Sequence, residues 1–227
     1  MELILVRHCE TQKNEKDKFD VLYDTNENFS EFGYHQLKIT GSYIEKLVGN
    51  ANSIIISGRR KRVTDTSEHL SEILNIRHII KENLIPIYSG NLAGMSNEEA
   101  LIKYPELMHK RKLFSENKLD GYEIQFPNGD NVKDYEKNIE KIIFDVLKEL
   151  RDYEKIIFVT HRSTILALLN IFNKQFELQE KNIYKFYQTP IGCIDVINFN
   201  SDDFKSGTIN RKNSIYIWSK EIEINEN

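Results

Sequence analysis

The chain has 227 residues, of which 40% are hydrophobic and 29% are charged, a composition that suits a soluble protein of one large domain or two small ones. Its formal net charge of −4, from 31 basic and 35 acidic residues, argues against a general nucleic-acid binder but still allows a few clustered arginines to bind a small anion. Two cysteines exclude a disulfide scaffold, and neither a membrane-spanning stretch nor a signal-peptide pattern is present, so we expect a cytoplasmic protein that does not bind membranes.

The first half of the chain alternates short apolar runs with helical patterns. Residues 1–7 form a continuous apolar run that predicts a buried strand, and Ser30 is a candidate N-cap for the helix that follows. Residues 53–57 predict a second buried strand, residues 60–74 a helix, and residues 79–87 a further strand.

The second half continues this alternation. The expected elements are a helix over 97–115 that breaks at Pro105, a long helix capped by Asp130, a strand at 156–160, a helix at 163–172, and tail strands around 193–199 and 208–218. Strands without polar alternation, separated by helices, predict an α/β fold with a mostly parallel sheet covered on both faces.

Polar residues stand where three of the predicted strands end. Arg7 and His8 end the first, the segment from Ser57 to Arg62 follows the second, and His161 ends the strand at 156–160. Because ligands bind at the carboxyl ends of strands in such sheets, we expect these side chains to converge on one site.

Histidine and arginine in this arrangement point to phosphoryl chemistry. A neutral imidazole has a lone pair that can accept a phosphoryl group, and a guanidinium can grip two phosphate oxygens. A lone Arg-His pair is more often a surface ion pair or a half-buried histidine. The joint pattern at three strand ends therefore favours a phosphate site at Arg7, His8, Arg62 and His161.

Several segments occur in the order in which the histidine phosphatase superfamily, the phosphoglycerate-mutase-like enzymes, carries its motifs. The chain resembles this family at Leu5–Thr11 with Asn14, at Phe29–Gly33 with Gln36, at Ser57–Val63 with Thr66, at Pro127–Asp130 and at Phe158–His161. Each segment is a weak match alone, and together they cover most of the chain up to about residue 171.

The resemblance implies a fold and a set of roles. The fold is a three-layer α/β/α sandwich in one domain over 1–227, with a small helical cap inserted at roughly 91–129. His8 becomes the transient phosphohistidine, Arg7, Arg62 and His161 hold the phosphoryl oxygens, and Asn14 adds a donor. Neither a metal nor another cofactor is implied.

Two departures from the family pattern lie close to these residues. Cys9 stands where glycine is usual, and it is either a small packing residue or an oxidation target. Arg59, Arg60 and Lys61 make the segment before Arg62 unusually basic. This run is either a solvated helix start or extra positive charge that suits a substrate with more than one anionic group.

The most consequential departure is Pro86, which replaces the family glutamate that protonates the leaving oxygen. Another carboxylate could take its place, and the candidates are Glu82, Glu98, Glu99 and Asp130. Alternatively, the substrate has a leaving group that needs little protonation, such as an aryl or acyl phosphate, or the protein binds a phosphorylated ligand and turns over poorly.

We therefore expect a metal-independent phosphatase that hydrolyses an anionic phosphorylated substrate through a phosphohistidine. The alternatives are a phosphoglycerate-mutase-type phosphotransferase and a catalytically weak phospholigand-binding protein. Loss of the acid would harm a mutase more than a phosphatase, because a mutase must also return the phosphoryl group to a second hydroxyl. A tail strand at Ser214–Trp218 is a candidate edge for pairing with a second copy in a homodimer.

Overall fold

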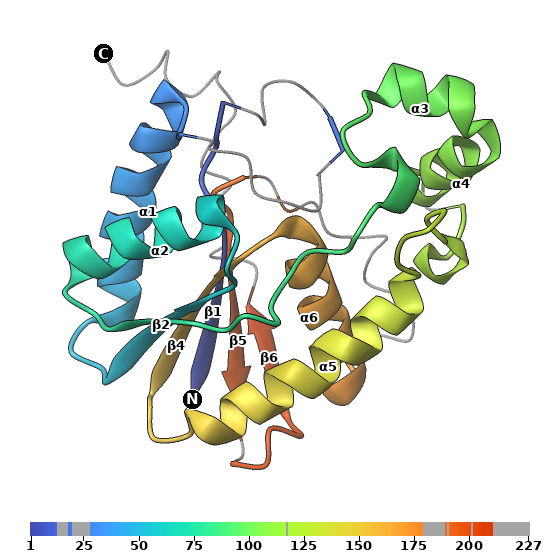
Figure 1. Ribbon diagram of the computed structural model, residues 1–227. Coiled ribbons are helices and arrows are strands. Elements are labelled where there is room, and N and C mark those ends of the chain that lie inside the picture. The colour runs from blue at the N-terminus through green and yellow to red at the C-terminus, as the bar shows by residue number, and fades with distance from the viewer. Residues whose placement is uncertain are drawn as a thin grey trace.

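The computed structural model describes residues 1–12, 18–19, 28–116, 118–178, 189, 191–200 and 202–210. Within this part, a mixed sheet is covered by helices on both faces (Figure 1). No helix among these residues is both long and apolar enough to cross a bilayer.

The sheet has six strands in the order β3-β2-β4-β1-β5-β6. The strands are β1 (Glu2–Arg7), β2 (Ser53–Ser57), β3 (His78–Ile80), β4 (Lys155–Thr160), β5 (Ile194–Phe199) and β6 (Gly207–Asn210). The pairings of β1 with β4, β4 with β2 and β2 with β3 are parallel, whereas β5 and β6 are antiparallel additions at one side. The predicted α/β class with a mostly parallel sheet is confirmed.

The helices form two outer layers and a separate group (Figure 1). They are α1 (Glu31–Val48), α2 (Lys61–Leu74), α3 (Asn97–Lys103), α4 (Pro105–Ser115), α5 (Val132–Glu149) and α6 (Arg162–Gln175), with the short 3-10 helices η2 (Gly90–Leu92) and η3 (Gly121–Glu123). Helices α1 and α2 cover one face of the sheet and α5 and α6 cover the other.

The unbroken apolar runs of the central strands follow from this layering. In β1, Leu3 and Leu5 belong to the core beneath α5 and α6, whereas Ile4 and Val6 belong to the core beneath α1 and α2. Successive side chains of a strand point to opposite faces, so a strand that is covered on both sides needs apolar residues at every position.

Helices α3, α4 and η3 lie in the interval where the cap was expected, and they have an apolar cluster of their own. That cluster includes Leu92, Leu107 and Phe126, and Phe19 from the segment after β1 packs against it. The backbone of Phe19 also pairs with this region, since its N–H donates to the Met95 carbonyl at 2.9 Å. The single-domain division with a cap over 91–129 remains a prediction.

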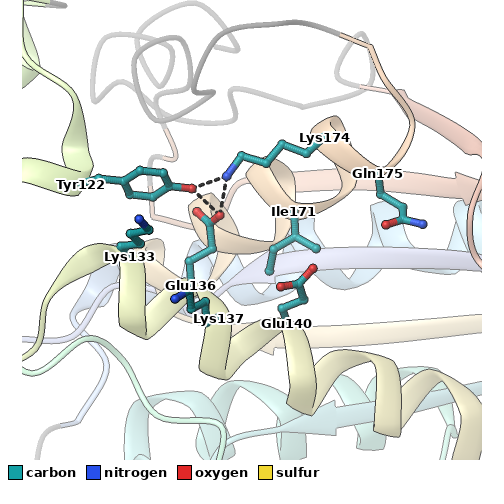
Figure 2. Close-up of a pocket in the computed structure, with 8 residues that line it drawn as sticks. All are labelled: Tyr122, Lys133, Glu136, Lys137, Glu140, Ile171, Lys174 and Gln175. Carbon is teal, nitrogen blue, oxygen red and sulfur yellow. Dashed lines mark hydrogen bonds and ion pairs between the residues drawn. The ribbon is translucent and has the colours of Figure 1, made fainter.

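A polar group around the buried Glu136 carboxylate, which we call the Glu136 cluster, joins η3 to α5 and α6. It consists of Tyr122, Glu136, Asn170 and Lys174. The Glu136 carboxylate accepts from the Tyr122 hydroxyl at 2.5 Å, the Lys174 ammonium at 2.8 Å and the Asn170 amide at 2.6 Å. Figure 2 shows Tyr122, Glu136 and Lys174 of this cluster beside a groove between α5 and α6. The volume of the groove is about 360 Å³. The cluster therefore fastens the cap interval to the two helices on this face of the sheet.

Some element boundaries differ from the sequence prediction. The strand expected over 79–87 ends at Ile80, because the backbone of Ile85 and Ile87 bonds to side chains of α5 and α6 instead of to a strand. The long helix is capped by Asn131 and not by Asp130. Asp130 instead accepts the Tyr88 N–H at 2.7 Å.

Other expectations are confirmed or lie outside the described residues. Ser30 caps α1, and Pro105 separates α3 from α4 and begins the second of them. The helix expected from residue 60 begins at Lys61. The Ser214–Trp218 edge lies outside the described residues, so the predicted homodimer stays a prediction.

Candidate active site

The two predicted histidines lie next to each other at the carboxyl ends of neighbouring strands. Strands β1 and β4 are paired in parallel with Arg7 opposite Thr160, and the His8 N–H donates to the Thr160 carbonyl at 3.0 Å. The ring centroids of His8 and His161 are 5.3 Å apart with an interplanar angle of 65°. Each residue is only 3% exposed. The predicted convergence of the strand ends therefore occurs at this pair.

The contacts of His8 fix which of its nitrogens carries the proton. Nδ1 lies 2.9 Å from the carbonyl oxygen of Cys9. A carbonyl can only accept a hydrogen bond, so Nδ1 must donate and the neutral ring must be protonated there. Nε2 then has the lone pair, which is the requirement for a nucleophile.

His161 has the opposite tautomer for the same kind of reason. Its Nδ1 lies 3.3 Å from Nη2 of Arg62. A guanidinium can only donate, so Nδ1 accepts and the proton of the neutral ring is on Nε2. In the described part of the chain, this buried Nε2 has no hydrogen-bond partner. The two rings thus combine a lone pair on His8 with an N–H donor on His161.

Burial and positive charge keep both rings neutral. The pKa of His8 is lowered well below its ordinary value, first by burial and then by the charges of Arg62 and Arg7. Burial also lowers the pKa of His161 well below its ordinary value, and the charge of Arg62 is the next cause, with smaller contributions from Arg60 and Arg7. The guanidinium groups can therefore attract an anion, while the neutral His8 ring keeps its lone pair.

Arg7 contacts a backbone carbonyl, and Arg62 lies in a helical turn that is bonded to the loop after His8. Arg7 Nη1 donates to the carbonyl of Thr189 at 2.5 Å. Arg62 is 6% exposed in the first turn of α2, and its own carbonyl accepts from the Thr66 hydroxyl at 2.7 Å. The same hydroxyl oxygen accepts the Cys9 N–H at 3.2 Å, which ties α2 to the loop after His8. Asn14 lies outside the described residues, so its predicted role stays a prediction.

The four candidate acids have other surroundings. Glu82 is 75% exposed at its side chain and pairs with Arg59, and Glu98 is exposed on α3. Glu99 forms a capping box with Ser96, and Asp130 accepts the Tyr88 N–H. None of these bonds leads to either histidine, so the assignment of a general acid remains a prediction.

Sequence reasoning did not connect Ser30, Gly33 or Gln36 with the support of the loop after His8. Gln36 Oε1 accepts the Glu10 N–H at 2.8 Å, and the Ser30 hydroxyl donates to the Glu10 carboxylate at 2.8 Å. A Cβ on Gly33 would lie 2.1 Å from the Glu10 carbonyl, so only glycine allows this close approach. The motif at Phe29–Gly33 with Gln36 contained the signal, because its polar and small residues lie on the face of α1 toward this loop.

Cys9 and Arg60 resolve two questions that the sequence left open. Cys9 is fully buried against Phe29 and Leu37, and burial raises the pKa of its thiol to about 12, which fits a packing role better than an oxidation target. Within the basic run, Arg59 is exposed but Arg60 is 8% exposed. The run is therefore not a uniformly solvated helix start.

A buried pair of imidazoles with arginines, at the carboxyl ends of parallel strands, defines a site of the phosphoryl-transfer kind. The chain matches the family model of the histidine phosphatase superfamily (branch 1) over residues 3–212. Because this match spans most of the chain, the protein belongs to the histidine phosphatase superfamily.

Individual relatives support the same class. The chain is 27% identical over 180 residues to phosphoserine phosphatase 1 of Hydrogenobacter thermophilus, covering 78% of this chain and 80% of that protein. Its fold is similar to that of a mycobacterial glucosyl-3-phosphoglycerate phosphatase, with a TM-score of 0.74, 18% identity and coverage of 92% and 96% of the two chains. The α-ribazole phosphatase of Shigella flexneri has a TM-score of 0.71, 16% identity and coverage of 92% and 95%.

Proposed function

We propose that the protein is a phosphatase that hydrolyses phosphate monoesters through a phosphohistidine on Nε2 of His8. Membership of the histidine phosphatase superfamily supports hydrolysis of phosphate esters as the class of reaction. The observation that carries the proposal is the pair of tautomers, because one ring offers a lone pair and the neighbouring ring at the same edge of the sheet offers an N–H donor.

The reaction would proceed in two displacements. In the first, the lone pair of His8 Nε2 forms a bond to phosphorus while the bond from phosphorus to the leaving oxygen breaks. Arg7, Arg62 and the Nε2–H of His161 stabilise the charge on the transferring phosphoryl oxygens. In the second, a water oxygen bonds to phosphorus, the P–N bond breaks, and a proton of that water passes to solvent. The products are inorganic phosphate and the free alcohol or phenol, or a carboxylic acid where the substrate is an acyl phosphate.

Pro86 bears on which substrates react well. No bond among the described residues brings one of the four candidate acids to the histidines, so the leaving oxygen would take its proton from solvent. Aryl and acyl phosphates need little protonation when they leave and are the substrates that this site would handle best. The same feature favours the second candidate, a phospholigand-binding protein with little turnover.

We also propose a cytoplasmic location. Both cysteines of the chain are buried, and they are not joined in a disulfide, which fits a reducing compartment. The expected absence of nucleic-acid and membrane partners remains part of this proposal.

The experiment is to assay para-nitrophenyl phosphate with the wild type, His8→Ala and the control His35→Ala, which changes an exposed histidine on α1. We expect His8→Ala to lose at least about a thousand-fold in kcat, since it removes the nucleophile, and His35→Ala to stay near the wild type. Rapid denaturation during turnover should trap an acid-labile phosphohistidine, detected by 31P NMR.

Two outcomes would contradict the proposal in different ways. Activity that persists in His8→Ala would remove His8 as the nucleophile. Absence of activity in all three proteins, with phosphate still bound in calorimetry, would favour the phospholigand-binding protein. Efficient isomerisation of phosphoglycerate would instead favour the mutase alternative.

A further inference from the structure

We propose that Gln36 is a positioning residue that sets the tautomer of His8 and thereby places the lone pair of the nucleophile. The inference rests on the proposed function and adds to it a residue of α1 that acts through a single peptide group. That group joins Cys9 to Glu10, because the carbonyl of Cys9 and the N–H of Glu10 belong to one planar unit. In a trans peptide the carbonyl and the N–H point in opposite directions, so this unit can be held from one side while it bonds on the other.

Gln36 is a polar residue in the buried stripe of α1. It is 1% exposed, and Gly33, Leu37 and Thr40 on the same side of the helix are buried with it. A buried amide is costly unless its oxygen and its nitrogen both have hydrogen-bond partners. The loops on either side of this stripe supply one partner each.

The two partners fix which way the amide of Gln36 faces. Its Nε2 lies 3.3 Å from the carbonyl oxygen of Ile191, which can only accept, so the nitrogen must be at this end. Its Oε1 then accepts the Glu10 N–H at 2.8 Å. A Cβ on Gly192 would lie 3.4 Å from Gln36 Cδ, so the turn before β5 packs directly on the amide. This turn therefore keeps the acceptor oxygen toward the loop after His8.

The peptide group of Cys9 and Glu10 passes this orientation on to His8. Its N–H donates to Gln36, and its carbonyl accepts from Nδ1 of His8 at 2.9 Å. Holding the N–H fixes the plane of the peptide and so the direction of the carbonyl. It also strengthens the carbonyl as an acceptor, because hydrogen bonds in a chain polarise one another. Gln36 thus keeps the proton of the neutral ring on Nδ1 and the lone pair on Nε2.

The other contacts of this loop hold the neighbouring peptide groups. The Thr66 hydroxyl accepts the Cys9 N–H at 3.2 Å. The Ser30 N–H donates to the Glu10 carbonyl at 3.1 Å. Neither bond involves the peptide group that accepts from Nδ1 of His8. Without the acceptor on α1 this group can turn, and the ring can then take either neutral tautomer.

The experiment compares Gln36→Met, which keeps the length of the side chain and removes the acceptor, with Gln36→Glu, which keeps an oxygen that accepts the Glu10 N–H. The control is Gln175→Met, the same change at a glutamine beside the groove of Figure 2, whose side chain makes no hydrogen bond to another described residue. Imidazole 15N chemical shifts at pH 7.5 report which nitrogen of His8 carries the proton, and the spectrum of His8→Ala assigns the signals.

We expect His8 to be protonated at Nδ1 in the wild type and in Gln175→Met, and to be a mixture of both neutral tautomers in Gln36→Met. The kcat of Gln36→Met for para-nitrophenyl phosphate should fall about ten-fold, the effect of losing one hydrogen bond that orients the nucleophile. KM should change less, since Arg7 and Arg62 still bind the phosphoryl group. Gln36→Glu should keep the Nδ1–H tautomer and lose less in kcat than Gln36→Met.

Two results would overturn the role of Gln36. One is the same His8 tautomer in Gln36→Met as in the wild type, and the other is an equal loss of kcat in Gln36→Met and Gln36→Glu, which would mean that position 36 only fills space. Circular dichroism confirms that each variant is folded at the assay temperature. Gln36→Asn replaces Gln36→Met if that variant does not fold, because its shorter amide draws back from Glu10 and should give the same mixture of tautomers.

The tautomer measurement separates this inference from the proposed function, because it needs no turnover. A tautomer that changes in Gln36→Met, in a protein that hydrolyses no phosphate ester, would refute only the proposed function. Hydrolysis through a phosphohistidine on His8, with a tautomer that does not respond to Gln36→Met, would refute only the role of Gln36.

Discussion

His8 and His161 have the same side chain, yet their neighbours give them different chemistry. A backbone carbonyl beside Nδ1 of His8 forces the proton onto that nitrogen, while a guanidinium beside Nδ1 of His161 forces it onto the other. Exchanging the two neighbours would leave an imidazole N–H where the lone pair is needed. The division between nucleophile and donor is therefore set by one contact at each ring.

Pro86 is the residue at which the missing acid can be tested. Its neighbours are bonded to α5 and to the first turn of α6, because the Ile85 carbonyl accepts from the Tyr135 hydroxyl at 3.0 Å and the Ile87 N–H donates to Ser163 Oγ at 3.2 Å. Ser163 follows His161 by two residues. A carboxylate introduced at position 86 would thus start from a backbone close to the phosphate site.

We predict that Pro86→Glu raises the activity toward alkyl phosphates about ten-fold or more relative to aryl phosphates, since general acid catalysis assists poor leaving groups most. The measurement is kcat/KM for β-glycerophosphate and para-nitrophenyl phosphate in the wild type, Pro86→Glu and the isosteric control Pro86→Gln. Equal behaviour of the glutamate and glutamine variants would show that a carboxylate at this position does not act as the acid.

The sequence predicted the main residues of the site because strand ends are easy to locate. His8, Arg62 and His161 each follow a continuous apolar run, and parallel strands bring such ends together. The inward turn of Arg60 could not be predicted, since four consecutive basic residues give no pattern that separates a buried side chain from an exposed one. The tautomers could not be predicted from the sequence either, because each depends on one neighbour placed by the tertiary structure.

At the scale of elements, the long helices were predicted better than the short segments between them. The apolar periodicity of α5 persists over 18 residues, and only its N-cap differs from the prediction, since it is Asn131 and not Asp130. The segment after β3 is apolar enough to resemble a strand, but Tyr135 and Ser163 bond its backbone from the neighbouring helices. A local pattern cannot reveal such distant partners.

The Glu136 cluster gives the prediction that belongs to this scale, since it joins η3, α5 and α6. The Tyr122 hydroxyl donates to the buried Glu136 carboxylate and accepts from the Asn170 amide at 3.0 Å. Burial is the first cause of the raised pKa of Tyr122, followed by its hydrogen bond to Glu136, so this hydroxyl stays protonated as a donor. Tyr122→Phe removes the hydroxyl and keeps the ring over which the Lys174 ammonium lies.

We predict that Tyr122→Phe lowers the free energy of unfolding by about 1–3 kcal/mol, because it removes a bond to a buried carboxylate. Urea denaturation measures this loss. Tyr104→Phe is the matched control, since the Tyr104 ring packs in the same apolar cluster and its hydroxyl makes no hydrogen bond to another described residue. A loss in Tyr122→Phe no larger than in the control would show that the cluster does not hold the cap interval in place.

At the scale of the whole molecule, the two neutral imidazoles link folding to pH. Both histidines have a pKa well below 6.5 in the folded protein, whereas an unfolded chain would titrate them near 6.5. Below this value the unfolded state binds more protons than the folded state, so the free energy of unfolding falls as the pH falls. The stabilisation is thus fully present above about pH 6.5 and is lost progressively below it.

We predict that His8→Gln/His161→Gln flattens this dependence. Between pH 6.5 and 5.5 the wild type should lose about 1 kcal/mol more for each of the two groups than the double variant does. Urea denaturation at pH 7.5, 6.5 and 5.5 measures the difference, in buffers free of phosphate, because an anion bound to the folded state would add its own stabilisation. His78, whose pKa is also lowered by burial, is present in both proteins and cancels in the comparison. Parallel pH dependences in the two proteins would mean that the imidazoles are not held neutral by the fold, and the lone pair assigned to His8 would then lack its electrostatic basis.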